Sequence, residues 1–553
     1  MKQLRQFVIC LLFVAAFASC SKPEQASGAG GGSKPTPEKP SQEITPDAGM
    51  TLYGLVSEVS DGSPIEGAVV SDGYSCVATD SRGVYQMKRH RDAKYVFIST
   101  PSGYECLSQK DFGNMPLFYQ ACKSLTGTAA SVYRADFQLK KRKSSSTRFR
   151  LVAIGDPQPD YDSDVERFRS ETVADINREI LQYSGSEMVS IALGDIIGID
   201  DNHSGKRLTK MKKVLGEVGT PVYHVIGNHD KDKLSPDGLT FSNIMGPLYY
   251  SFNMGLVHFV ILDNLRFSSN TDYTLGFTKE QYDWLVQDLS FVPKNHKIVL
   301  CYHAPMYDSY AKYAYATEIF NIVLPYKDPI LIAGHTHNYK YSKNKLGLRE
   351  YILSTACGYF WRGNHATDGT PNGYYIFSFD GTDVRDMYFK GTDWDKSHQM
   401  RIYRASDSYT IAGGGTYSFS DDSFGKGEIA INVFSGGPDW KVTVYEDGVK
   451  TGTATCLDSQ YDRWMCALYI SHAYKTTKLD DITKAKHIYR YTLKNPSASQ
   501  IKVEAQDPWG NVYTETSVVG KNDFSLAMPH YLKSLKNGDD RPYNYNWIND
   551  ITK

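Results

Sequence analysis

The sequence predicts an α/β core flanked by two all-β sandwiches, and three observations support this architecture. In residues 147–395, apolar runs of strand length alternate with helical patterns. In residues 51–140 and 397–553, short alternating strands are separated by turns rich in Gly and Asp. At 553 residues, the chain also exceeds what one hydrophobic core usually serves. We therefore expect three folded domains with these boundaries.

The first fifty residues are typical of an export signal followed by a tether. Basic Lys2 and Arg5 precede the apolar run 7–17, which is too short to span a bilayer. Cys20 follows two small residues, as in a bacterial lipobox, so residues 1–20 are expected to be a lipoprotein signal peptide and Cys20 the lipidated first residue. Simple cleavage and release is the alternative. Residues 21–50 are rich in Ser, Pro, Gly and Lys and are expected to be a disordered tether. The predicted location is the cell envelope, on the periplasmic or surface face of the outer membrane.

The net charge and the cysteine content limit which binding partners and which cysteine sites are expected. The formal net charge of -1 gives no electrostatic footprint for nucleic acid, so no specific nucleic-acid binding is expected. We expect a monomer whose lipid attaches it to the membrane. The cysteines lack metal-type spacing, and an oxidising compartment leaves open a pairing of Cys456 with Cys466 or of Cys106 with Cys122.

Residues 51–140 have the pattern of a small sandwich. Turn signals at Asp61-Gly62 and Asp72-Gly73 separate strand-like runs at 54–59, 67–70, 83–87 and 95–98. The pattern G-x-V-x…P-I-x-G-A-V-V…T-D-x-x-G-x-Y resembles the transthyretin-like or carboxypeptidase-regulatory-like sandwiches found beside secreted enzymes. No catalytic residue stands out in it.

The middle segment has the rhythm of an α/β domain. A helix is expected over 163–183, with Val165, Phe168, Ile176 and Ile180 on one face, and another over 279–289. Buried strands are expected at 149–154, 188–193, 222–226, 257–262, 298–302 and 330–333. Beyond this segment, clean alternation returns, for example at Ile429, Ile431 and Val433, which predicts the C-terminal sandwich.

Several of the predicted core strands end in a polar cluster, and the carboxyl ends of strands in α/β sheets are where ligands bind. In chain order the clusters are Gly155-Asp156-Pro157-Gln158, Gly194-Asp195, Gly227-Asn228-His229-Asp230, Tyr302-His303-Ala304-Pro305 and Gly334-His335-Thr336-His337. Alone, a Gly-Asp after a strand is usually a turn, and a single histidine is usually a core residue. The third and fifth clusters are more specific. The chance that all five occur in this order by coincidence is very small.

This ordered set resembles the calcineurin-like metallophosphoesterase superfamily, whose signature is D-x-H, G-D, G-N-H-D/E, H and G-H-x-H. The whole layout is similar to three-domain bacterial secreted members with N-terminal and C-terminal β-sandwich modules. The resemblance implies a four-layer core of two facing mixed sheets flanked by helices. It also implies hydrolysis of a phosphomonoester or phosphodiester by a hydroxide that bridges two metal ions.

The resemblance implies a ligand set for two divalent or trivalent ions, Mn, Fe or Zn. Two ions about 3.5–4 Å apart need a bridging ligand, a role that a carboxylate fills well, and by resemblance this is Asp195. One ion is expected on Asp156, Gln158, Asp195 and His337, and the other on Asp195, Asn228, His303 and His335. Only two of these seven side chains are anionic, so the loaded site is net positive and attracts phosphate.

Further residues are expected to act on the substrate. By resemblance, His229 stabilises the transferring phosphate and protonates the leaving group, Asn228 contacts the substrate, and Asp230 orients neighbouring groups. In the aromatic and glycine-rich segment after the last cluster, Arg362 could grip phosphate and Trp361 stack on an organic group. A glycine-rich turn with one buried tryptophan is the alternative.

One residue departs from the common signature. Gln158 stands where histidine is usual, so an amide oxygen replaces an imidazole nitrogen, which favours Mn or Fe over Zn. The same departure motivates the rival hypothesis of a weakly active or inactive surface binding protein. A zinc peptidase has no support, because no H-E-x-x-H motif occurs. Which phosphate ester is used stays open.

Overall fold

The computed structural model describes residues 43–518. The gaps within this range are 125, 128–131, 145–146, 199–203, 232–234, 270–271, 362–363, 405–407, 412–414, 419–423, 426, 464 and 466–481. The signal peptide with Cys20, most of the tether, Arg362 and Cys466 lie outside the described residues. None of the helices in the described part has the length and apolar character needed to cross a membrane.

The end of the expected tether is part of the folded unit. Residues from Pro46 onward belong to one compact unit. The Asp47 backbone N–H donates to the Gln86 side chain at 2.9 Å, and Met50 N–H donates to the Asp47 carbonyl. Residues at the end of the predicted tether therefore have specific hydrogen-bond partners.

The described N-terminal strands pack as a sandwich. One sheet has the order β6-β10-β1-β9-β8, with β4 on β1, and the other has the order β3-β2-β5-β7. Leu52 and Val56 of β1 share a hydrophobic cluster with Val70 of β2 and Val96 and Ile98 of β5, which is the packed interior. The bounds are β1 Leu52–Glu58, β2 Val69–Ser71, β3 Cys76–Ala78, β4 Val84–Met87, β5 Tyr95–Ser99, β6 Tyr104–Cys106, β7 Tyr119–Ala121, β8 Thr126–Gly127, β9 Tyr133–Arg134 and β10 Phe137–Lys141, with a 3₁₀ turn at Cys122–Ser124.

In the described part of the core, strands form two facing mixed sheets. The first has the order β13-β12-β11-β22-β23 and the second β14-β15-β18-β19-β21-β20. Each contains parallel and antiparallel pairs, for example β11 with β12 and β11 with β22. The bounds are β11 Arg148–Ile154, β12 Glu187–Ala192, β13 Val222–His224, β22 Gly373–Asp380 and β23 Asp383–Gly391 in the first sheet; β14 Tyr250–Met254, β15 Val257–Ile261, β18 Lys297–Cys301, β19 Ile330–Ala333, β20 Lys340–Lys343 and β21 Arg349–Ile352 in the second; and a hairpin of β16 Leu265–Phe267 and β17 Tyr273–Leu275.

The central strand β11 shows why these strands read as continuous apolar runs. Leu151 and Ala153 point into the cluster between the sheets, whereas Val152 and Ile154 point into the cluster under the helices. Phe149 meets Phe259 of the other sheet at a ring-centroid distance of 6.0 Å. Both faces of the strand are therefore buried, which removes the alternation seen in half-exposed strands.

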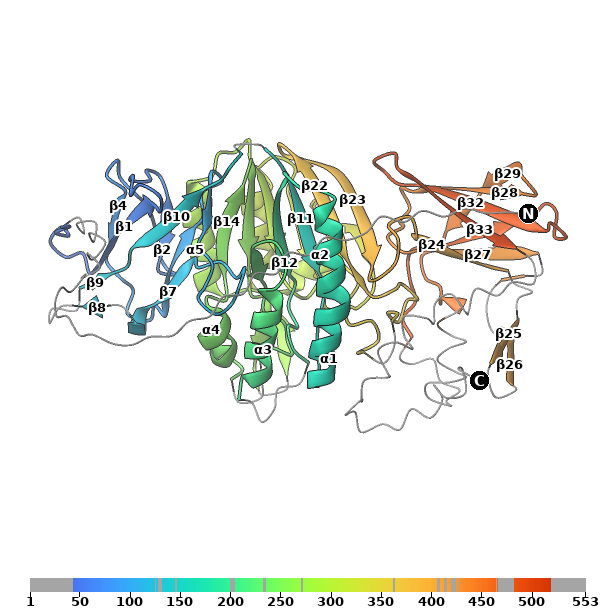
Figure 1. Ribbon diagram of the computed structural model, residues 1–553, viewed down its shortest axis with the longest axis horizontal. Coiled ribbons are helices and arrows are strands. Elements are labelled where there is room, and N and C mark those ends of the chain that lie inside the picture. The colour runs from blue at the N-terminus through green and yellow to red at the C-terminus, as the bar shows by residue number, and fades with distance from the viewer. Residues whose placement is uncertain are drawn as a thin grey trace, which may run out of the picture. The chain divides into compact units, whose positions relative to one another are not determined.

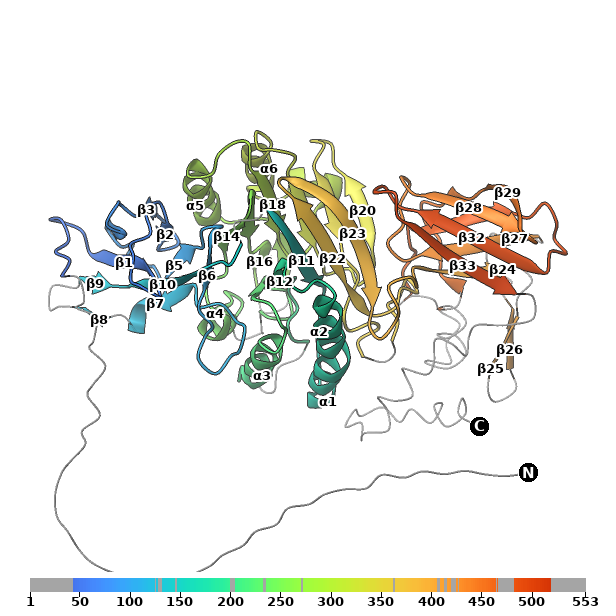
Figure 2. The ribbon, with the colours of Figure 1, turned by 45° about the horizontal axis from the view of Figure 1, so that its top comes forward.

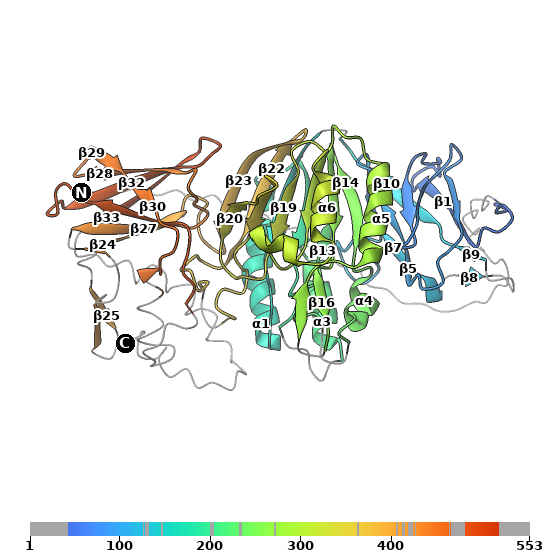
Figure 3. The same cartoon turned by 180° about the vertical axis from the view of Figure 1, so that it is seen from behind.

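Helices cover the outer faces of both sheets. Figure 1 shows α1 (Asp162–Arg167), α2 (Ala174–Leu181) and α3 (Lys206–Leu215) in front of the sheet with β11 and β12. Figure 3, from behind, shows α5 (Lys279–Ser290) and α6 (Ala316–Val323) over the other sheet. Short α4 (Leu239–Met245) and a 3₁₀ segment (Tyr307–Lys312) lie in connections. This layering confirms the predicted α/β core. The expected helix 163–183 differs in one respect: a π-helical segment, Phe168–Val173, joins α1 to α2.

The described C-terminal strands also form two sheets (Figure 2). One has the order β24-β27-β31-β30 and the other β29-β28-β32-β33, beside a hairpin of β25 and β26. Ile429 and Ile431 of β27 and Val442 and Val444 of β28 share one buried cluster, as expected for a sandwich. The bounds are β24 Met400–Arg404, β25 Ser408–Ile411, β26 Gly415–Ser418, β27 Glu428–Val433, β28 Lys441–Glu446, β29 Val449–Thr453, β30 Thr455–Cys456, β31 Ile488–Thr492, β32 Gln500–Gln506 and β33 Val512–Val518.

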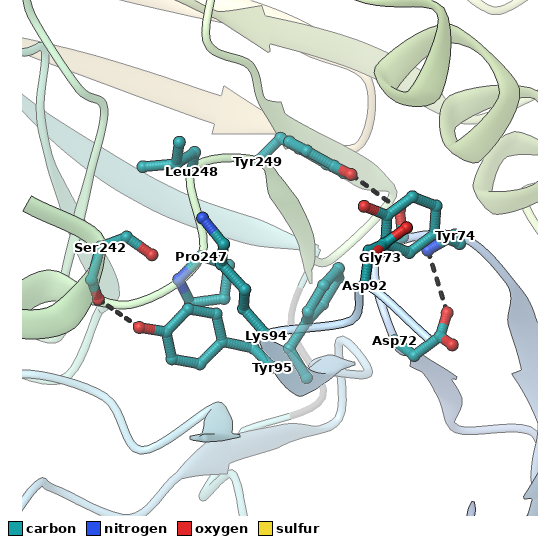
Figure 4. A pocket seen from close by; sticks show the side chains of 11 residues that line it. Asp72, Gly73, Tyr74, Asp92, Lys94, Tyr95, Ser242, Pro247, Leu248 and Tyr249 are labelled. Carbon is teal, nitrogen blue, oxygen red and sulfur yellow. Dashed lines mark hydrogen bonds between the residues drawn. The ribbon is translucent and has the colours of Figure 1, made fainter. Parts of the chain in front are cut away.

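The N-terminal sandwich is joined to the core by specific contacts. The Tyr95 hydroxyl donates to the Ser242 carbonyl, and the Tyr249 hydroxyl donates to the Gly73 carbonyl at 2.8 Å, on the walls of a small pocket (Figure 4). The hydroxyls of Tyr95 and Tyr249 thus hold the two parts together. Cys106 and Cys122 are free, so the alternative that paired them is wrong.

Candidate metal centre

The predicted ligands lie in loops at the carboxyl ends of parallel strands. The loops follow β11, β12 and β13, which pair in parallel in the first sheet, and β18 and β19, which pair in parallel in the second. They carry, in that order, Asp156 and Gln158; Asp195; Asn228; His303; and His335 and His337. The carboxyl ends of the two facing sheets therefore supply one site from five segments.

The side chains of these loops converge on His303. Its Nε2 lies 3.2 Å from Asp195 Oδ2, 3.1 Å from Asn228 Oδ1 and 3.2 Å from His335 Nδ1. Asp156 Oδ1 lies 3.9 Å from the same nitrogen and 3.7 Å from His337 Nε2. Such a concentration of lone-pair donors suits a cation.

The donors fall into two groups that share one residue. Asp195, His303 and His335 offer atoms within 4.8 Å of one another, as do Asp156, Asp195 and His337. The division coincides with the two ligand sets expected from the sequence, with Asp195 common to both. The residues present therefore fit two metal ions bridged by a carboxylate.

Gln158 supplies an independent sign that a partner belongs here. Its side-chain oxygen is buried and has no hydrogen-bond partner within the described part of the chain, while its backbone N–H donates to the Asp195 carbonyl at 2.9 Å. A buried amide oxygen without a partner is unfavourable unless something binds it. An ion held by the Asp156 group would satisfy it.

The imidazole of His303 is already oriented as a ligand. Its Nδ1 lies 2.8 Å from the Leu193 carbonyl, to which it donates. This bond fixes the ring and directs Nε2 toward the other donors, as is usual for metal-binding histidines. His303 and Asp156 are fully buried, so solvent does not compete for them.

The loop backbone is held in conformations that ordinary residues avoid. Five of the predicted ligands have positive φ: Asp156, Gln158, Asp195, His335 and His337, with values from 36° to 70°. Such strain persists when surrounding structure enforces it and is concentrated at functional sites. The ligand loops are therefore shaped for placement of their side chains.

Two of the motif glycines lie so close to ligand side chains that a larger residue would not fit. A Cβ on Gly194 would lie 2.5 Å from His303 Nδ1, and one on Gly227 would lie 2.1 Å from Asp195 Oδ1. Any larger residue would push the ligand loops apart.

Burial and mutual charge set the ionisation of the centre. Burial raises the pKa of Asp156 to about 8, although His303 opposes the shift. Burial lowers the pKa of His335 to about 4 and of His337 to about 3. These two histidines are therefore neutral at pH 7 and have lone pairs to offer. For Asp195, burial is the largest single influence and would raise the pKa, but the charges of His303 and His229 together with the hydrogen bonds from both residues outweigh it and lower the pKa.

Asp230 and His229 occupy different environments. Asp230 is buried, and its carboxylate accepts from Gly227 N–H at 2.7 Å and Ile197 N–H at 3.1 Å, so it ties two ligand loops together. His229 is exposed; its backbone N–H donates to Asp195 Oδ1 at 2.9 Å, and its Nδ1 lies 3.1 Å from the Gly198 carbonyl. With Nδ1 donating to that carbonyl, Nε2 is the nitrogen left to face a substrate.

The expected substrate-stacking role of Trp361 is wrong. Only 1% of this residue is exposed, and its indole N–H donates to the Pro157 carbonyl at 2.8 Å. The neighbouring Phe360 is 36% exposed, and its ring centroid lies 4.9 Å from that of His337. Both residues have positive φ, and no pattern in the sequence signals which of the two rings turns outward. Arg362 lies outside the described residues.

Comparison with known proteins places the chain in a family. Residues 149–339 match the family described as Calcineurin-like phosphoesterase, and residues 50–142 and 350–513 match its N-terminal and C-terminal families. Purple acid phosphatase 23 of Arabidopsis thaliana is 31% identical over 150 residues, which are 24% of this chain and 31% of the relative. Probable inactive purple acid phosphatase 9 of the same plant is 30% identical over 159 residues, 27% of this chain and 22% of the relative.

The matched segment thus spans less than a third of either curated relative. Among solved structures, a dimetal phosphatase from Danio rerio is 16% identical, with a TM-score of 0.31, over 44% of this chain and 96% of that one. The three family matches together cover the N-terminal strands, the core with its ligand loops, and the C-terminal strands. The chain is a member of the calcineurin-like phosphoesterase family.

Proposed function

We propose that this chain hydrolyses phosphomonoesters or phosphodiesters at two metal ions held by Asp156, Gln158, Asp195, Asn228, His303, His335 and His337. The observation that supports this most is the pair of donor groups that share Asp195. A carboxylate common to two clusters of buried donors is what a dinuclear site needs and has little use otherwise.

The chain's own residues prepare the reaction in several ways. When bound, two such ions act as Lewis acids on a phosphoryl oxygen and make the attacking water more acidic. Asp195 holds both clusters at a fixed separation, and Asp230 fixes the loops that carry Asp195 and Asn228. With two anionic ligands among seven, the loaded site keeps a positive surplus that draws in phosphate.

His229 is proposed to move the proton. Its ring is exposed and anchored through Nδ1 to the Gly198 carbonyl, so Nε2 can donate to the departing oxygen. Asn228, half-buried beside His303, is proposed to contact the phosphate as well as a metal.

The organic part of the substrate is proposed to lie on Phe360. An exposed aromatic ring beside the ligand His337 offers an apolar surface next to the reacting phosphate. Arg362, two residues on, remains a proposed phosphate contact on sequence grounds alone.

The metals are proposed to be Mn or Fe in preference to Zn at the position that Gln158 serves. An amide oxygen is a harder ligand than an imidazole nitrogen, and hard ligands favour Mn and Fe(III). One relative of this chain, from Arabidopsis thaliana, is named Fe(3+)-Zn(2+) purple acid phosphatase 12.

Release of nitrophenol from mono- and bis-nitrophenyl phosphate tests the proposal. Metal-loaded protein is expected to release it, and Asp195→Asn is expected to lose at least about 100-fold, since it removes the bridging charge. Asp288→Asn, at a buried aspartate paired with His258, is the control for general destabilisation and should keep its activity. Turnover that survives in Asp195→Asn contradicts the proposal.

An inactive binding protein is the second candidate. It is favoured by the unusual Gln158 and by the relative named as probably inactive. The same assay separates the two functions, because a binding protein would take up metal and turn over neither ester.

We also propose export and lipid anchoring through Cys20, and a monomeric state. Labelling with radioactive palmitate in a bacterial host is expected to mark the wild-type chain and not Cys20→Ala. Light scattering on the purified chain is expected to give the mass of one copy.

A further inference from the structure

The segment after the His335 and His337 loop is held by a buried carboxylate. The backbone N–H of Tyr339, two residues beyond His337, donates to Asp368 Oδ2 at 3.1 Å. Asp368 lies between β21 and β22, is fully buried, and also accepts from Thr370 N–H at 2.9 Å. The carboxylate thus fixes the chain where it leaves the ligand loop.

The same carboxylate oxygen is bound from the C-terminal sandwich. His487, immediately before β31, places its Nε2 3.1 Å from Asp368 Oδ2 and its Nδ1 2.8 Å from Asn432 Oδ1. The amide of Asn432 donates to the Asp368 carbonyl at 3.0 Å and to Asp462 Oδ2 at 2.8 Å, which assigns its oxygen as an acceptor. Both ring nitrogens of His487 therefore lie at hydrogen-bond distance from side-chain oxygens, one of Asn432 and one of Asp368.

The side chains of this hydrogen-bond network are fully buried. His487, Asn432, Asp368 and Asp462 each have 0% exposure, and the Tyr403 hydroxyl donates to Asp462 at 2.8 Å. The Tyr339 ring also meets the His487 ring edge to face, with centroids 6.3 Å apart. In such an environment every partner is needed, because a buried polar group that loses its partner is costly.

We propose that His487 is a positioning residue of the metal centre. It fixes Asp368, which fixes Tyr339 and with it the direction of His335 and His337. The inference rests on the proposed function only in taking these two histidines as ligands. Its consequence is that the C-terminal sandwich, 150 residues along the chain from the ligand loop, is part of the working site.

This differs from ordinary interdomain packing. Apolar contact alone would hold the sandwich against the core without favouring one orientation of the loop. Directional bonds from His487 and Asp368 instead specify the position of one backbone N–H. Indirect partners of metal ligands typically contribute about 10- to 100-fold in metal affinity.

The core contains a matched control for His487. His258 has its Nδ1 2.9 Å from Asn253 Oδ1 and its Nε2 2.8 Å from Asp288 Oδ2, and the ring is almost fully buried. It has the same kind of partners, but it lies at the start of β15, one residue past Val257, whereas the ligand loops follow strand ends. His258→Leu therefore reproduces the loss of a buried His–Asp pair without touching the ligand loops.

The test is Mn²⁺ titration of the full chain by calorimetry, with circular dichroism as the check on folding. We expect His487→Leu to weaken at least one Mn²⁺ site by about 10- to 100-fold and His258→Leu to leave both sites unchanged. His487→Gln keeps one N–H to offer to Asp368 and is expected to recover most of the affinity. The pair His487→Met and His258→Met, which lack such an N–H, serves if a leucine variant does not fold.

Each outcome is decisive. Equal Mn²⁺ affinities in wild type and His487→Leu, or equal losses in the His487 and His258 variants, overturn the positioning role. Wild type that binds Mn²⁺ but cleaves no ester overturns the proposed function and leaves this inference standing. Wild type that binds neither Mn²⁺ nor, in a repeat titration, Fe²⁺ overturns both.

Discussion

The indole N–H of Trp361 donates to the carbonyl of Pro157, the residue between Asp156 and Gln158, at 2.8 Å. A fully buried ring therefore braces the backbone that carries two of the proposed ligands. The Trp361 carbonyl in turn accepts from Arg167 of α1, so the brace reaches the helical layer. What looked in the sequence like a substrate contact is a support for the metal loop.

Removing that brace is expected to weaken metal binding. Trp361→Phe keeps an aromatic ring but leaves the Pro157 carbonyl unpaired, at a cost of about 1–3 kcal/mol. Mn²⁺ affinity at the Asp156 site should fall about 10-fold, measured by calorimetry. Trp284→Phe, at another buried tryptophan, packed against Phe97 and Tyr249, is the control. Equal affinities in wild type and Trp361→Phe would show that the brace does not act on the ligands.

Restoring histidine at position 158 is expected to change metal preference. In Gln158→His, an imidazole nitrogen replaces a buried amide oxygen that finds no hydrogen-bond partner among the described residues, and the softer ligand favours Zn. The ratio of zinc-supported to manganese-supported hydrolysis should therefore rise over wild type. Equal wild-type activity with the two metals would remove the ligand-hardness explanation.

Phe360 is expected to contribute to substrate binding and not to chemistry. Phe360→Ala removes an exposed ring next to His337 and should raise KM for an aryl phosphate about 10-fold, with kcat within about twofold. Phe291→Ala, at a phenylalanine 42% exposed after α5, should change neither constant. A loss confined to kcat would place Phe360 in the reaction itself.

His224 is expected to make the fold sensitive to acid. Burial, with Lys212 nearby, lowers the pKa of His224 to about 3, and its ring nitrogens have no hydrogen-bond partner among the described residues. In the unfolded chain His224 binds a proton below about pH 6.5, whereas in the folded chain it stays neutral there. The free energy of unfolding is therefore at its full value above pH 6.5 and falls by about 1.4 kcal/mol per pH unit below it. Urea unfolding at pH 7 and pH 5 measures the loss.

In His224→Leu this loss should shrink by about 2 kcal/mol, because leucine takes up no proton on unfolding. His90→Leu, at an exposed position, should keep the wild-type loss. If His224→Leu lost as much stability as wild type between the two pH values, the buried neutral histidine would not be the cause.

Much of the core could be predicted from the sequence, because a strand that is buried on both faces has a recognisable composition. Strands such as β11 must be apolar at every position, and the polar residues after them stand out. The order of the five polar clusters then indicated which loops meet. The π-helical segment within 162–181 could not be predicted, since its apolar positions also suit an α-helix.

Two features of the site depend on contacts that sequence patterns do not encode. Trp361 is turned inward, where its indole N–H donates to the Pro157 carbonyl, whereas Phe360 is exposed. The bond between His487 and Asp368 joins residues 119 positions apart, and each alone is an unremarkable polar residue. Long-range hydrogen bonds of this kind appear only once the parts are folded together.

The central claim is that two ions share Asp195, and crystals soaked in manganese test it most directly. Anomalous difference maps are expected to show two peaks about 3.5–4 Å apart, one beside Asp156, Gln158 and His337 and one beside Asn228, His303 and His335, with the Asp195 carboxylate between them. A single peak, or peaks that Asp195 does not join, would contradict it.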